Sequence, residues 1–140
     1  MAEQELHLIV ITPARAVYDD DARSVVVPAF DGELGVMANH AALISLLGNG
    51  PLRITRADGS RELLAVRGGF LQVKNNVVTV LTQESVMADE IDSKQVDADL
   101  EEARALPAVT DEEFEVRESK LAWALTRRKI LEAARGESRN

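Results

Sequence analysis

Few side chains in this sequence could perform acid–base or nucleophilic chemistry. The near-neutral bases are His7 and His40, and the chain has no cysteine. A nucleophile would have to be a serine, threonine, lysine or carboxylate. Neither a G-x-S-x-G motif nor a G-x-x-x-x-G-K-[ST] phosphate loop occurs in the sequence. We therefore predict no catalytic residue, no metal site and no cofactor.

A carboxylate between two glycines is the most prominent candidate for a binding role. Gly32 and Gly35 flank Glu33, and this spacing favours a tight turn that carries the carboxylate. His40 follows where the apolar pattern breaks, and we expect its side chain to hydrogen-bond within a loop. The simpler alternative is a turn that leads into a core strand over 41–47 and binds nothing.

Composition limits the kind of partner that this chain could have. Its 140 residues include 24 acidic and 16 basic side chains, a net charge of −8. This balance argues against nucleic acid, whose phosphates require a basic surface. No apolar run approaches the ~20 residues of a membrane span, and the N-terminus lacks the pattern of a signal peptide. The lack of cysteine excludes disulfides and is compatible with a reducing compartment.

Residues 1–88 are predicted to be β-structure because turn signals recur about every 8–12 residues without a helical period. Asp58-Gly59 and Asn75-Asn76 indicate tight hairpins. We also expect turns at Asp19–Asp21, at Gly48–Pro51 and at Gly68-Gly69. This pattern is typical of an antiparallel sandwich or a flattened barrel.

Residues 89–140 are predicted to form an antiparallel helical hairpin. The first helix is capped by Asp92 or Ser93 and runs to about Ala105. The second begins at a capping box formed by Thr110 and Glu113. We expect it to end near residue 135, because a glycine follows there.

The predicted hairpin has an uneven charge and two apolar stripes. Residues 89–119 carry 12 acidic and 3 basic side chains, whereas residues 120–140 carry 6 basic and 2 acidic ones. On the second helix one stripe contains Phe114, Leu121 and Leu125, and the other contains Val116, Trp123, Ile130 and Ala134. Two such stripes suit an arm that docks and undocks. They suit equally well a helix packed permanently between two neighbours.

Several short motifs, in order along the chain, resemble the epsilon subunit of rotary F-type ATP synthases. The strongest is Gly32–Val36 with Asn39–Leu43, which is similar to the family pattern G-E-L-G-(V/I) followed by H-A-P-L, with Ala42 in place of proline. Further matches are Thr12-Pro13, Gly68-Gly69-Phe70-Leu71, Asn76-x-Val78-Thr79-Val80-Leu81 and Ala88-x-Glu90-Ile91-Asp92. The resemblance covers nearly the whole chain.

The resemblance implies a two-part α+β fold, with a ten-stranded antiparallel β-sandwich in residues 1–88 and an antiparallel α-helical hairpin in residues 89–140. It implies a non-catalytic central-stalk subunit that couples rotation of the membrane ring to ATP synthesis. The implied partners are the gamma subunit, the proton-carrying rotor ring and an acidic loop of the catalytic beta subunit. The chain would reach the cytoplasmic face of a bacterial membrane, or the stromal face of a thylakoid, only through this complex.

The resemblance also assigns roles to individual residues. It places Glu33 and His40 at the interface with the rotor ring and the gamma subunit. It implies that the helical arm folds against the sandwich or rises into the catalytic head, where it blocks ATP hydrolysis. The basic contacts of the raised arm would be Arg127, Arg128, Lys129 and Arg135.

A nucleotide site is present only in degenerate form. Some members of the family bind ATP through an (I/L)-D-x-x-R-A motif, and here Ile91 and Asp92 match its first two positions. Gln95 and Val96 replace the arginine and the alanine. Since glutamine lacks the fixed positive charge that a phosphate prefers, the sequence disfavours ATP binding.

Two alternative functions stay open at this point. One is a stand-alone regulator that senses ATP through the same β-sandwich and helices. The other is an unrelated β-sandwich enzyme or adaptor, which would require Glu33, His40 and a third polar group to converge in a closed pocket.

Overall fold

The computed structural model describes residues 4–139. The chain divides into two compact units, of which one ends at Met87 and the other begins at Ala88. Each unit has a hydrophobic core of its own. Neither helix of the described residues has an apolar run of the length that a bilayer-spanning helix requires.

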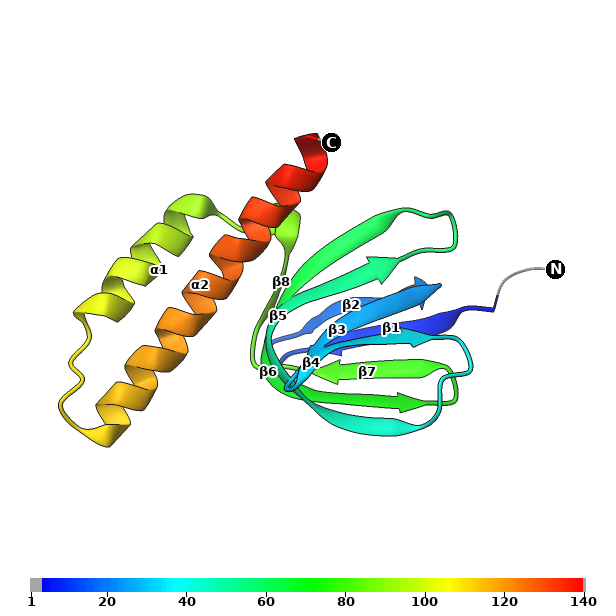
Figure 1. Cartoon of the computed structure of the whole chain (residues 1–140), viewed down its shortest axis with the longest axis horizontal. Helices are drawn as coiled ribbons and strands as arrows, with labels where there is room; N and C mark the ends of the chain where they lie inside the picture. The colour runs from blue at the N-terminus through cyan, green and yellow to red at the C-terminus, as the bar shows by residue number, and fades with distance from the viewer. Residues whose placement is uncertain (1–3, 140) are drawn as a thin grey trace. The chain divides into compact units, whose positions relative to one another are not determined.

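The first unit is a β-sandwich built from one eight-stranded sheet (Figure 1). Its strands are β1 (Leu6–Ile11), β2 (Ala16–Ala22), β3 (Ser24–Ala29), β4 (Gly32–Met37), β5 (Leu43–Thr55), β6 (Arg61–Lys74), β7 (Val77–Leu81) and β8 (Ser85–Met87). Their order in the sheet is β2-β1-β7-β6-β5-β3-β4, and β8 pairs with β6. All pairs are antiparallel except β1 with β7, which is parallel.

Two long strands explain why there are eight strands here instead of the expected ten. The predicted turns at Gly48–Pro51 and Gly68-Gly69 do not end a strand, because β5 and β6 pair in one unbroken register from Leu43 opposite Val73 to Thr55 opposite Arg61. At Gly69, φ is +109° and an added Cβ would lie 1.8 Å from the backbone oxygen of Leu81. Glycine is therefore required here by the close approach of a neighbouring strand.

Two other predicted turns also lie within strands. Asp19–Asp21 belongs to β2, which is at one edge of the sheet. Glu33 belongs to β4, at the opposite edge, and the turn that precedes β4 lies at residues 30–31. The predicted hairpin turns at Asp58-Gly59 and Asn75-Asn76 are confirmed.

Alternating side chains of these strands fill the core of the sandwich. In β1 the residues Leu6, Leu8 and Val10 are fully buried and their neighbours are half-buried. Leu52, Leu64 and Leu71 are also fully buried. Because a fully buried side chain of this size stabilises a fold by about 1.5–3 kcal/mol, such positions dominate the stability of the unit.

The second unit contains the short 3-10 helix η1 (Ala88–Glu90) and the helices α1 (Ser93–Ala105) and α2 (Asp111–Arg139), which form the predicted hairpin (Figure 1). The Asp92 side chain caps α1 by accepting from the backbone N–H of Lys94. The reciprocal bonds of Thr110 and Glu113 at the start of α2, both 3.1 Å, confirm the capping box. The expected end of the second helix at Gly136 is wrong, because α2 continues to Arg139.

The two helices pack through a small apolar core. Val96 and Leu100 of α1 and Ala124 of α2 are buried, and Leu121 packs against them. The two predicted stripes of α2 are each buried only in part. In one stripe Trp123 and Ile130 are buried but half of Val116 is exposed, and in the other Phe114 and Leu125 are exposed.

Candidate interaction surfaces

A row of exposed apolar side chains crosses three strands of the sandwich. Leu46 on β5 lies opposite Phe70 on β6, which lies opposite Leu81 on β7. Their exposed fractions are 51%, 54% and 50%. Since contiguous exposed apolar side chains mark interaction sites, this row is a candidate docking surface.

This row was not among the predicted sites, although the sequence contains a signal for it. Successive side chains of a strand point to opposite faces. Pairs of adjacent large apolar residues, such as Leu46-Leu47 and Phe70-Leu71, therefore predict strands that are apolar on both faces. One side chain of each pair fills the core, and the other is left on the surface, where a partner can bury it.

Glu33 is not free on a turn but held on the edge strand β4. Its carboxylate accepts a hydrogen bond of 2.8 Å from the Arg53 guanidinium of β5. About half of each of the two side chains is exposed. Such exposed ion pairs contribute at most about 1 kcal/mol, so Glu33 can exchange Arg53 for another donor at little cost.

His40 lies beyond the other end of β4, so the structure does not bring it together with Glu33. The strand rise alone separates Glu33 from Met37 by about 13 Å. As expected, the His40 side chain hydrogen-bonds within its loop, with Nδ1 2.8 Å from the backbone oxygen of Ala41. Asn39, at a φ of +67°, precedes it and anchors the loop through the side chains of Asn76 and Gln4.

His7 has partners that the sequence analysis missed. Its Nδ1 lies 2.7 Å from Oδ1 of Asp21, and its Nε2 lies 2.5 Å from Oδ1 of Asp19. Both carboxylates come from β2, in register with β1. Because both ring nitrogens can donate only in the imidazolium, the site selects the charged form. Once β1 and β2 are known to pair, two aspartates spaced i, i+2 on β2 indicate such a cluster.

The stability of the sandwich should depend on the protonation of His7. Hydrogen bonds to Asp21 and Asp19 raise the pKa of His7 above 6.5. Because the pKa is higher in the folded state, this stabilisation is complete below the unfolded pKa and is lost as pH rises through the folded pKa. We expect the urea midpoint of the unmodified chain to fall as the pH is raised above about 6.5, and the midpoint of His7→Gln to fall less over the same range. An equal pH dependence in both proteins would contradict this.

Of the predicted basic residues of α2, Arg127 is engaged within the hairpin. Its Nη2 donates to Oδ2 of Asp99 on α1 over 2.9 Å, and its guanidinium lies 5.4 Å from the centre of the Trp123 ring. Burial raises the pKa of Asp99, but hydrogen bonds from Gln95 and Arg127 outweigh it and lower the pKa below its usual value. Arg128 pairs with Glu132 on its own helix, at 3.6 Å, and Lys129 and Arg135 are exposed.

Loss of the ion pair between Arg127 and Asp99 should loosen the hairpin. We expect a coupling free energy of about 1 kcal/mol from a double-mutant cycle of Arg127→Ala and Asp99→Asn, measured by urea unfolding. The matched control is Arg128→Ala, which we expect to cost less than about 0.5 kcal/mol because its pair is exposed. Equal losses of unfolding free energy in Arg127→Ala and Arg128→Ala would show that the pair of Arg127 with Asp99 does not stabilise the hairpin.

The residues of the degenerate nucleotide motif already have structural roles. The Asp92 carboxylate caps α1, and the Gln95 side chain donates to Asp99 over 2.8 Å. Ile91 packs against the apolar core of the hairpin. The polar groups of this motif are therefore used within the hairpin itself.

The structure does not bring the two candidate polar residues of the Gly32–Leu43 region together. Glu33 and His40 lie at opposite ends of β4. Across residues 4–139, no group of three or more histidine, cysteine, aspartate or glutamate side chains is placed to hold a metal ion. Three features of the described surface could contact partners: the apolar row, the edge carboxylate of Glu33 and the basic end of α2.

Comparisons with known proteins agree with both units of this fold. The family described as "ATP synthase, Delta/Epsilon chain, beta-sandwich domain" matches residues 5–88. An ATP synthase epsilon chain of a Synechococcus species is 37% identical over 127 residues, which cover 91% of this chain and 92% of that protein. The ATP synthase epsilon chain of Synechococcus elongatus is 45% identical over 103 residues, which cover 74% of this chain and 69% of that protein.

A solved structure has the same fold. A chain in the Euglena gracilis mitochondrial ATP synthase, in an assembly described as OSCP/F1/c-ring, matches with a TM-score of 0.75 and 26% identity. The match covers 93% of this chain and 81% of that chain. The similarity therefore extends through the sandwich and the helices.

Proposed function

This chain belongs to the ATP synthase epsilon chain family, and we propose that it is the non-catalytic central-stalk subunit of a proton-translocating F-type ATP synthase. In this role it couples rotation of the membrane ring to ATP synthesis, and its helices restrain ATP hydrolysis. The observation that carries the proposal is the 37% identity to an ATP synthase epsilon chain, in an alignment that covers 91% of this chain and extends through both units.

The apolar row of Leu46, Phe70 and Leu81 supports a permanent contact with the gamma subunit. Each side chain of the row is about half exposed, so a partner can bury the remainder. The cores of stable interfaces are apolar and poor in charge, as this row is. A subunit that transmits torque needs a stable interface of this apolar kind. Charges at the rim of an interface affect the orientation of the partners and the association rate more than the affinity.

Glu33 and His40 support contact with the rotor ring and the gamma subunit through different ends of β4. Glu33 is on the sheet edge with Arg53 as an exchangeable partner. A basic or amide-bearing loop of the ring could replace the Arg53 guanidinium. His40 lies in a loop fixed by Asn39 and Asn76, which suits a contact of defined shape.

The last turns of α2 support the inhibitory role of the helical unit. Arg128, Lys129 and Arg135 are exposed on a helix end whose dipole also favours cations. A raised arm could present them to an acidic loop of the catalytic beta subunit. Arg127 would first have to leave Asp99, so the hairpin contact opposes this arrangement. For such a switch to work, the free energies of the folded-down arm and the raised arm must differ by no more than a few kcal/mol.

The direct test of the proposed interaction is co-purification with the gamma subunit of the same complex. We expect this chain and gamma to elute together in size-exclusion chromatography at micromolar concentration. Separate elution under conditions where both proteins are folded would contradict the proposal.

A further inference from the structure

Three asparagine residues with left-handed backbones lie in two loops at one end of the sandwich. Asn39 is in the loop between β4 and β5, and Asn75 and Asn76 form the two-residue turn between β6 and β7. Their φ angles are +67°, +51° and +63°. Asparagine adopts this conformation more readily than most residues, and glycine adopts it at no steric cost. Since glycine would serve the backbone equally well, the asparagine side chains need an explanation of their own.

The side chain of Asn76 ties the two loops together. Its Oδ1 accepts from the backbone N–H of Asn39 over 2.6 Å, and its Nδ2 lies 3.4 Å from Oδ1 of Asn39. The backbone oxygen of Asn76 accepts from the N–H of His7 in β1 over 2.8 Å. Asn39 also donates from Nδ2 to the side chain of Gln4. These bonds attach the loop at residues 38–42 to a hairpin turn that is 37 positions away in the sequence.

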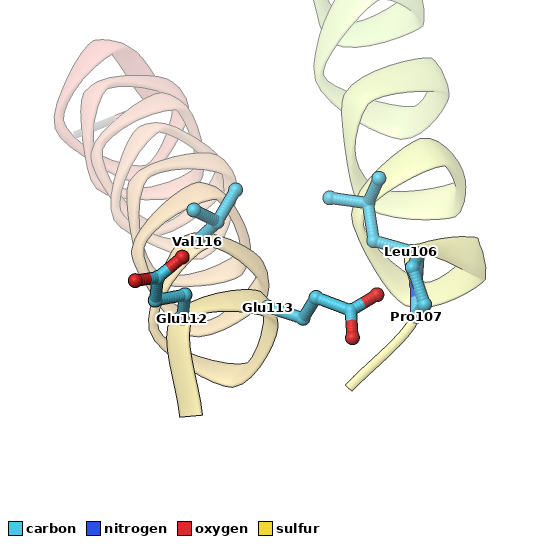
Figure 2. A pocket seen from close by; sticks show the side chains of 5 residues that line it. All are labelled: Leu106, Pro107, Glu112, Glu113 and Val116. Carbon is cyan, nitrogen blue, oxygen red and sulfur yellow. The ribbon is translucent and has the colours of Figure 1, made fainter. Parts of the chain in front are cut away.

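The tip of the helical hairpin is held in a different way. Its pocket is lined by Leu106, Pro107, Glu112, Glu113 and Val116 (Figure 2). The capping box fixes this tip through bonds between Thr110 and Glu113, three positions apart, and such bonds satisfy the helix itself. The bonds between Asn39 and Asn76 cap no helix and belong to no strand pair. They serve to fix one loop against another.

Exposed apolar side chains flank the loop that Asn76 holds. Met37, the last residue of β4, is 62% exposed, and Ile44, the second residue of β5, is 73% exposed. Side chains two positions apart on a strand share a face, so Ile44 continues the apolar row from Leu46 toward this loop. Exposed apolar side chains that adjoin one another mark interaction sites. The loop therefore lies beside the surface that we assign to the gamma subunit.

We propose that Asn76 is a positioning residue, which holds the loop at residues 38–42 so that the loop and the apolar row meet the gamma subunit as one preformed surface. The inference rests on the proposed function, because it takes the gamma subunit as the partner. A loop that is already ordered avoids the loss of affinity that ordering it on binding would cause. The turn is a suitable anchor because its strands, β6 and β7, carry Phe70 and Leu81 of the row.

Three substitutions separate the side chain of Asn76 from the turn that it belongs to. Asn76→Gly removes the bonds to Asn39 but keeps the turn, because two-residue turns with positive φ at both positions favour Asn-Gly. Asn75→Gly is the matched control in the same turn, since the bonds that tie the two loops come from Asn76. Asn76→Asp keeps an oxygen acceptor for the N–H of Asn39 and also tolerates positive φ, so it should restore the function of the side chain.

Relaxation of the backbone ¹⁵N nuclei in the full chain measures the order of the loop without a partner. We expect the order parameters of residues 39–42 to fall from about 0.85 to below about 0.6 in Asn76→Gly. They should stay high in Asn75→Gly and in Asn76→Asp. An equally ordered loop in Asn76→Gly and Asn75→Gly would overturn the claim that Asn76 holds the loop.

Calorimetry with purified gamma subunit then tests whether the ordered loop contributes to binding. We expect Asn76→Gly to bind about five- to ten-fold more weakly than the unmodified chain, and the other two variants to bind within about two-fold of it. Equal affinity of Asn76→Gly despite a disordered loop would overturn the positioning role and leave the proposed function intact. An unmodified, folded chain that does not bind gamma would refute the proposed function and this inference together.

Discussion

Replacing Phe70 by aspartate is expected to weaken binding of this chain to the gamma subunit by roughly 100-fold, which corresponds to about 2.7 kcal/mol. Phe70 is the middle member of the apolar row, directly opposite Leu46 and Leu81. The variant loses the burial of an aromatic ring and places a carboxylate in an interface core that excludes water. Isothermal titration calorimetry with purified gamma measures the effect.

The matched control is Val109→Asp, which makes the same kind of change at an exposed position of the helical unit. We expect it to change the affinity for gamma by less than three-fold. Both variants should stay folded because both positions are exposed, and circular dichroism checks this. An affinity of Phe70→Asp within three-fold of the unmodified chain would remove the apolar row from the interface.

Deleting both helices, Ser93–Asn140, is expected to raise ATP hydrolysis by the reconstituted enzyme five-fold or more. Inhibition by the arm is a coupling between two sites, and such couplings are typically worth about 1–3 kcal/mol. Both helices are removed together because Val96 and Leu100 of α1 would otherwise lose Ala124 as their cover. A steady-state hydrolysis assay on the assembled complex measures the change.

The truncated chain should remain folded because the sandwich has its own buried core. A cooperative thermal transition of the truncated chain is the control. Reversal of the exposed charges in the full chain, Arg128→Glu with Lys129→Glu, should raise hydrolysis in the same direction but less. Unchanged hydrolysis in the truncated complex would end the inhibitory role while leaving the stalk role intact.

The helical unit was predictable because its boundaries depend on local contacts. Asp92 caps α1, and Thr110 with Glu113 caps α2, through bonds between residues two or three positions apart. Gly136 failed as a stop signal because glycine lowers helix stability by only about 1 kcal/mol. A helix as long as α2 can continue through it.

The sandwich was less predictable because the same local signal permits two outcomes. Gly68-Gly69 could end a strand or lie within one, and only the pairing of β5 with β6 shows that the strand continues. Asp19–Asp21 resembles a turn in sequence, yet on an edge strand the charges help prevent pairing with other chains. These outcomes depend on residues distant in sequence.

Long-range register also limited the prediction of the site. The contact of His7 with Asp19 and Asp21 exists because β1 and β2 pair in one particular register. The salt bridge of Glu33 with Arg53 joins residues that are twenty positions apart, on different strands. Neither pair can be read from spacing before the topology is known, whereas the family resemblance was readable from short motifs.

ATP-driven proton pumping by an F-type ATP synthase complex that lacks its epsilon subunit tests the central claim most directly. Adding this chain to the depleted complex in liposomes should restore pumping together with stable assembly of gamma and the rotor ring, and the isolated chain should hydrolyse no ATP. Pumping that stays absent although the chain is folded, or ATP hydrolysis by the chain alone, would contradict the account.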